Sequence, residues 1–107
     1  MRKFTYNDDY IYLVMDLEDV FKNISVKFSF INDNRIIHTL EEDISTDKSK
    51  YVRLCPFMKI DTLAENNISG EIIIRYNIDQ ILHGDIVVEL SKDKNNYLPS
   101  GGLDVHV

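Results

Sequence analysis

Two similar seven-residue segments constrain the fold of this chain more than any other feature. Residues 70–76 and 84–90 each begin with glycine and an acidic residue, and three β-branched residues follow. Valine and isoleucine are stiff at χ1 and pack well on a pleated surface, and glycine lets the chain turn where a side chain would clash. Both segments are therefore predicted to be strands, with residues 77–84 connecting them.

Further segments have patterns typical of strands. Residues 24–30 alternate strictly, which predicts a strand with one buried face. Residues 10–17 are apolar at both parities, as in a strand covered on both faces. Residues 51–55 alternate and end at Pro56, which cannot donate to a ladder. The inward positions of the 24–30 strand are Ile24, Val26, Phe28 and Phe30.

Turn residues and polar segments divide these strands. Asn and Asp at 32–34 tolerate the left-handed conformation of tight turns, so residues 35–40 are expected to fold back as a hairpin. The acidic segment 41–50 is predicted to be an exposed loop. Residues 57–67 fit either one helical turn or an irregular corner strand. Residues 1–9 fit an arm or a short edge strand, and residues 103–107 a terminal strand after a turn at 99–102.

Many short strands without a long helical pattern predict an all-β fold. We expect one domain over residues 1–107, built as an antiparallel two-sheet sandwich of about seven strands, with an open barrel as the alternative. A chain of 107 residues is long enough to bury one core.

Residues 68–74 resemble the entry to the F strand of immunoglobulin-like modules, where a glycine precedes alternating inward positions. Ile72 and Ile74 occupy the places where antibody domains carry the tyrosine-corner Tyr and the second disulfide Cys. The chain has no Trp and a single Cys, which excludes the antibody-type subfamily. The resemblance implies an Ig-like topology over residues 10–90, and such folds host unrelated functions.

Composition limits the partners and the compartment. A formal net charge of −6 with scattered basic residues argues against nucleic acid as a partner. No segment approaches the roughly 20 apolar residues that span a bilayer, so no membrane insertion is expected. The N-terminal segment lacks the apolar run and cleavage site of a signal peptide. A single cysteine suits a reducing compartment, so the expected location is the cytoplasm or a virion.

No catalytic, cofactor-binding or metal-binding residue is predicted. His38, His83 and His106 are the possible histidine bases, and none lies in a motif with a nucleophile and an orienting acid. Cys55, just before a proline at a strand end, is predicted to be a small buried hydrophobe. The acids of residues 33–47 do not match a calcium loop. The chain is therefore not expected to be an enzyme.

Tyrosines and the two ends are the predicted partner-binding elements. Protein interfaces are enriched in tyrosine, and Tyr6, Tyr10 and Tyr97 lie near polar segments and chain ends. Leu103 and Val105 belong to a terminal strand that could pair with its own sheet or with a neighbour. Residues 1–9 and 99–107 are thus the expected contact segments.

Three functions fit these observations. The first is a non-enzymatic structural or interaction module that self-associates or joins a larger assembly such as a phage capsid or tail. The second is an acidic inhibitor or immunity-type protein that blocks a basic site, with salt-sensitive association. The third is a sandwich that binds a ligand such as a glycan, which requires exposed aromatic residues in a row on one face or at one end.

Overall fold

The structure, a computed structural model, describes residues 2–45 and 51–92 and the backbone of residues 103–106. Short strands make up most of it, and one short helix lies between β6 and β7. The strands are β1 (Arg2–Thr5), β2 (Tyr10–Glu18), β3 (Ile24–Asn32), β4 (Arg35–Ile44), β5 (Tyr51–Leu54), β6 (Phe57–Lys59), β7 (Gly70–Ile78), β8 (Leu82–Ser91) and β9 (Leu103–His106), and the helix is α1 (Ile60–Glu65).

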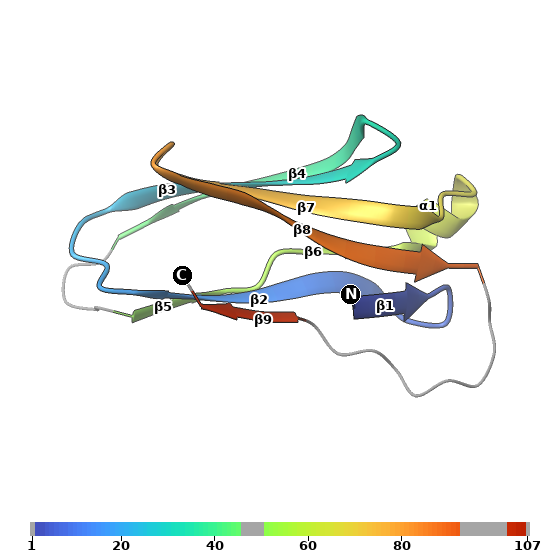
Figure 1. Ribbon diagram of the computed structural model, residues 1–107, viewed down its shortest axis with the longest axis horizontal. Helices are drawn as coiled ribbons and strands as arrows, with labels where there is room; N and C mark the ends of the chain where they lie inside the picture. Colours follow the sequence, from blue (N-terminus) through green and yellow to red (C-terminus); the bar gives the residue numbers. More distant parts are fainter. Residues whose placement is uncertain (1, 46–50, 93–102, 107) are drawn as a thin grey trace.

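The strands form two sheets that lie one over the other (Figure 1). The five-stranded sheet has the order β1-β8-β7-β3-β4. In the other sheet, β2 pairs with β5 and β6 along one edge and with β9 along the opposite edge. The predicted all-β, sandwich-like fold is therefore confirmed.

Both terminal strands pair in parallel, which the sequence reasoning did not anticipate. β1 runs parallel to β8 and β9 runs parallel to β2, while the other pairs are antiparallel. The expectation of a purely antiparallel sandwich is wrong at these two places. A terminal strand has no hairpin to dictate its direction, since its partner is far away in sequence.

The core lies between the two sheets. Strand β3 buries the four predicted inward side chains, and β7 buries Ile72, Ile74 and Ile78. Strand β2 contributes its odd-numbered residues to this core, whereas Tyr12 and Val14 on its outer face are only half-buried. The odd-numbered core residues of β2 are Ile11, Leu13, Met15 and Leu17. The expected cover on both faces is therefore complete on the inner face and partial on the outer one, where Asp16 is buried and Tyr12 and Val14 are half-buried.

The predicted hairpin between β3 and β4 is confirmed. Asn32 pairs with Arg35, and the two residues between them, Asp33 and Asn34, have φ of 50° and 62°. Asparagine and aspartate adopt this left-handed conformation more readily than other residues with a side chain. The sequence of this turn therefore explains its geometry.

Two boundary predictions are corrected. The acidic segment was expected to be a loop from residue 41, but β4 continues to Ile44, with Glu41 opposite Lys27 in the register. Edge strands tolerate exposed acids because one edge and one face meet water. Residues 57–67 contain both expected structures in succession, first β6 and then the single turn of α1.

Pro56 divides what is otherwise one long strand. Met15 pairs with Leu54 and Tyr12 with Phe57, so the register along β2 is unchanged across the gap. The N–H of Leu13 still donates to the Pro56 carbonyl oxygen at 3.1 Å. Proline has no N–H to return, and this explains why the ladder is interrupted there.

The two glycines that open the similar segments have different roles. Gly70 has φ of +96°, a conformation that favours glycine. Gly84 lies inside β8 rather than in a turn, directly opposite Tyr76. A Cβ atom at Gly84 would stand 2.5 Å from the Tyr76 hydroxyl oxygen. The predicted turn role holds at Gly70 and is wrong at Gly84, where glycine makes room for a tyrosine.

Gly84→Ala is expected to lower the free energy of unfolding by about 1–3 kcal/mol, the usual range for overpacking. Alanine would otherwise be the better residue inside a strand. In a Tyr76→Leu background the same change should cost much less, because the clashing ring is gone. Urea denaturation of the four proteins measures this coupling. Strictly additive costs would show that the ring does not require the glycine.

Candidate functional site

Three large apolar side chains are exposed together at one end of the sandwich. Phe21 in the β2–β3 connection is 69% exposed, and Ile81 in the β7–β8 turn is 74% exposed. Leu82, the first residue of β8, is also exposed. Both connections lie at the left end of Figure 1. We call Phe21, Ile81 and Leu82 the end patch.

Hydrogen bonds hold the β7–β8 turn firmly. The Asp79 N–H donates to the Ser25 carbonyl oxygen, and the Ser25 N–H donates to Asp79 Oδ1, both at 2.8 Å. The Gln80 N–H donates to Asn77 Oδ1 at 2.8 Å. The two bonds between Asp79 and Ser25 join the turn to the start of β3. Ile81 is therefore presented on a fixed turn.

The same turn has a left-handed backbone. Asp79 and Gln80 have φ of 51° and 58°. Glutamine, unlike asparagine or glycine, gains little there, and the left-handed conformation costs roughly 1–2 kcal/mol for a residue with a Cβ. The Ile81 N–H donates to the Ile78 carbonyl oxygen at 3.0 Å across these two residues. This is the type I′ turn that β-hairpins favour, and the φ values at Asp33 and Asn34 have the same sign.

The end patch surrounds a shallow hollow of about 220 Å³. Its apolar lining includes Leu17, Ile24 and Ile78, which belong to the core at this end. Charged residues also line it: Glu18, Asp19, Asp79 and Lys22. Three acids against one lysine leave this hollow negative.

A second, polar hollow of about 300 Å³ adjoins the first, since both are lined by Ile24 and Asp79. Asp43 at the end of β4 contributes another carboxylate, and Ser25 and Ser45 contribute hydroxyl groups. The end of the sandwich thus places an apolar hollow beside an acidic, polar one.

Exposed aromatic residues mark a second surface, the outer face of the smaller sheet. Tyr10 on β2, Tyr51 on β5 and Phe57 on β6 are 41%, 47% and 50% exposed. Tyr10 and Phe57 form an edge-to-face pair with ring centroids 5.4 Å apart. We call these three residues the aromatic face.

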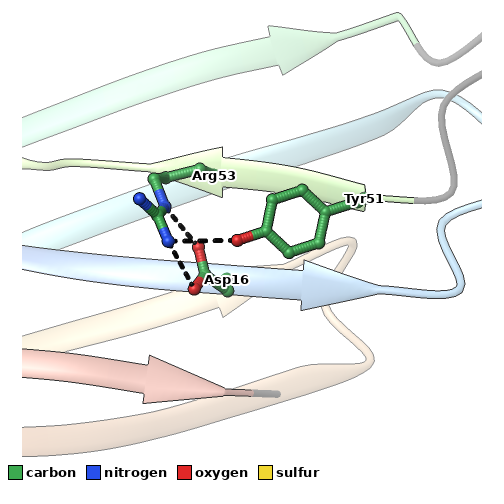
Figure 2. Close-up of polar contacts among 3 residues, drawn as sticks. All are labelled: Asp16, Tyr51 and Arg53. Carbon is green, nitrogen blue, oxygen red and sulfur yellow. Dashed lines mark hydrogen bonds and ion pairs between the residues drawn. The ribbon is translucent and has the colours of Figure 1, made fainter.

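An ion pair fixes β5 to β2 next to the aromatic face (Figure 2). Arg53 Nε donates to Asp16 Oδ1 at 2.7 Å and a terminal guanidinium nitrogen donates to Oδ2 at 3.1 Å. The same nitrogen donates to the Tyr51 hydroxyl at 3.1 Å. The Asp16 side chain is only 4% exposed. This cluster is a structural tie, because its charges are satisfied by one another.

Hydrogen bonds in this cluster, and in the Arg75–Asp85 pair of the other sheet, shift the pKa values of their members. The hydrogen bond with the Asp16 carboxylate raises the pKa of the Tyr51 phenol above its ordinary value. The same carboxylate, through its hydrogen bonds, raises the pKa of Arg53 further. On the other sheet, hydrogen bonds from Arg75 hold the pKa of Asp85 below its ordinary value. None of these shifts creates a group that titrates near neutral pH.

The predicted partner-binding residues lie in several places. Tyr6 is half-buried and its hydroxyl donates to the Ile68 carbonyl oxygen at 2.6 Å, which ties β1 to the segment after α1. Tyr10 is exposed on the aromatic face. Leu103 and Val105 pair with β2 through the backbone of β9. Tyr97 lies outside the described residues. Partner binding by these residues stays a prediction.

The residues considered for catalysis are dispersed. His38 is half-buried on β4 beside Phe30, and His83 lies on β8 rather than in a connection. Cys55 is exposed, so its predicted burial is wrong. It follows the last residue of an edge strand, and the alternation that buries Leu54 turns Cys55 outward. Within residues 2–45 and 51–92 no three potential ligands gather for a metal ion.

Sequence reasoning missed the end patch. Phe21 stands between the two predicted strands 10–17 and 24–30, and Ile81 and Leu82 stand in the predicted connection 77–84. The sequence did contain one sign of this patch, which is the presence of large apolar residues in segments between strands. An exposed turn is not stabilised by such side chains. Their proximity depends on which turns meet in space, which the sequence alone did not specify.

Comparison with family models, with curated proteins and with solved structures gave no match to this chain. No helix among the described residues is long and apolar enough to cross a membrane. Function is therefore inferred from the chain's own surfaces.

Asp16→Ala is expected to lower the free energy of unfolding by about 2 kcal/mol, because it removes two charge-assisted hydrogen bonds from a buried position. Asp85 is a matched control. It makes the same two-pronged pair with Arg75, but its side chain is 41% exposed. Asp85→Ala should cost under about 1 kcal/mol. Urea denaturation at neutral pH compares them, and equal losses would contradict a special role for burial.

Proposed function

We propose that this protein is a non-enzymatic interaction module that binds another protein through the end patch. The observation that carries the proposal is that Phe21 and Ile81 are both exposed and both line one hollow. Contiguous exposed apolar surface is costly in water and commonly marks a protein-binding site. The proposed setting is a larger assembly, such as a phage capsid or tail, formed in a reducing compartment.

The rigidity of the β7–β8 turn supports this proposal. Binding is weakened by the entropy lost when flexible side chains and loops become ordered. Here the turn is already fixed by Asp79 and Asn77 before any partner arrives. A fixed isoleucine loses little additional freedom on binding and is therefore an efficient contact residue.

We further propose an Ig-like strand topology. The order β8-β7-β3-β4 corresponds to G-F-C-C′ of a variable-type module, and β2 paired with β5 and β6 corresponds to B and E. The resemblance at residues 68–74 falls on β7, which takes the F position. The parallel pairing of β9 with β2 departs from this pattern. An experimental structure with β5 and β6 in the other sheet would refute the assignment.

Phe21→Ser and Ile81→Ser are each expected to reduce partner capture from the native source at least about tenfold, as for typical interface hot spots. Their thermal midpoints should change little, because both side chains are exposed. Ile36→Ser is the matched control, since Ile36 is 64% exposed on the β3–β4 hairpin at the opposite end. The Ile36→Ser protein should still capture the partners, which mass spectrometry identifies. Capture that survives both patch variants would refute the proposal.

A second candidate is glycan binding on the aromatic face. Three exposed aromatic side chains lie on one face, and Lys59, opposite Tyr10 in the register, adds a donor beside them. Apolar ring surfaces with a few polar groups are typical of small-ligand sites. If this function holds, a glycan array will show binding that Phe57→Ala abolishes and Phe21→Ser leaves intact. An array without signal would eliminate the candidate.

A further inference from the structure

We propose that the end patch takes a short protein segment in which one large apolar side chain is followed closely by lysine or arginine. This inference rests on the proposed function and adds the chemistry of the partner. It comes from the two adjoining hollows, one apolar and one acidic, that share Ile24 and Asp79.

The apolar hollow is large enough for one side chain. An apolar cavity of about 150 Å³ accommodates benzene, and this hollow measures about 220 Å³. Phe21, Ile81 and Leu82 surround the entrance, while Ile24 and Ile78 lie at the core side. An aromatic or branched aliphatic side chain would fill it and would cover the exposed faces of the end patch.

The charge around that hollow favours a basic residue close to the apolar side chain in the partner segment. Glu18, Asp19 and Asp79 line the apolar hollow, and Asp43 lines the polar one. The Lys22 Nζ lies 3.8 Å from Asp79 Oδ2, and the two side chains are 69% and 21% exposed. Lys22 offsets the charge of Asp79, while Glu18, Asp19 and Asp43 keep the end of the sandwich acidic. This charge disfavours an acidic partner segment.

Asp79 lies between the two hollows and lines both of them. One of its carboxylate oxygens accepts the Ser25 N–H, and the residue itself forms part of both linings. A cationic side chain placed next to the bound apolar group would reach the Asp79 and Asp43 side of the surface. Carboxylates and hydroxyl groups there can accept hydrogen bonds from lysine or arginine.

The overall charge of the chain favours the same partner. A net charge of −6 attracts basic surfaces over about 8 Å at physiological salt. Complementary charge raises the association rate and suppresses wrong partners more than it adds affinity. The apolar hollow would then supply affinity, and the acids would supply selectivity.

Two capped peptides test this inference, Lys-Leu-Phe-Leu-Lys and the acidic analogue Glu-Leu-Phe-Leu-Glu. In ¹⁵N–¹H spectra at millimolar peptide, the basic peptide should shift the amide resonances of Ser25, Asp79, Ile81 and Leu82. It should bind about fivefold or more tightly than the acidic one. Its preference should shrink as salt is raised. Equal binding, shifts elsewhere or no shifts would overturn the inference.

Charge-neutral variants separate this inference from the proposed function. Glu18→Gln, Asp19→Asn and Asp43→Asn combined should abolish the preference for the basic peptide, because they remove charge without changing shape. Ile81→Ser should weaken the binding of both peptides. If the native partner is lost with Ile81→Ser but its binding does not change with the three neutral substitutions, the proposed function stands and the basic-partner inference falls. If the native partner still binds the Ile81→Ser protein, the proposed function itself fails.

Discussion

The smaller sheet depends on one strand, β2. Strands β5 and β6 pair with one of its edges and β9 with the other. The inner face of β2 also buries four large side chains against the opposite sheet. At about 1.5–3 kcal/mol for each buried side chain, that face contributes on the order of 10 kcal/mol. This is comparable to the whole net stability of a typical domain, so the sandwich requires β2.

The same arrangement explains why the outer face of β2 tolerates a charged residue. Asp16 lies between strands that pair on both sides, which removes it from water, and Arg53 on β5 neutralises it with two hydrogen bonds. A buried carboxylate without such a partner would cost several kcal/mol. The ion pair also distinguishes this register from one shifted by a single residue, which would separate the two charges.

The sequence predicted what depends on local pattern. Alternation located the strands, and Asp33 and Asn34 located the hairpin, because side-chain period and turn chemistry are properties of neighbours in the chain. It failed where distant residues decide the outcome. The parallel partners of β1 and β9, the continuation of β4 to Ile44 and the exposure of Cys55 each depend on which strand lies alongside. The end patch belongs to this second group, since two separate turns create it.

The end patch also shows why stability does not account for every residue in this fold. Ile24 and Ile78, which line the same hollow as Ile81, belong to the core. The turn beside them has the type I′ backbone of an ordinary hairpin, so its positive φ values follow from the pairing of β7 with β8. The side chain of Ile81 is different, because it is 74% exposed and the turn geometry does not require an isoleucine there. A binding partner that covers Ile81 would account for this side chain.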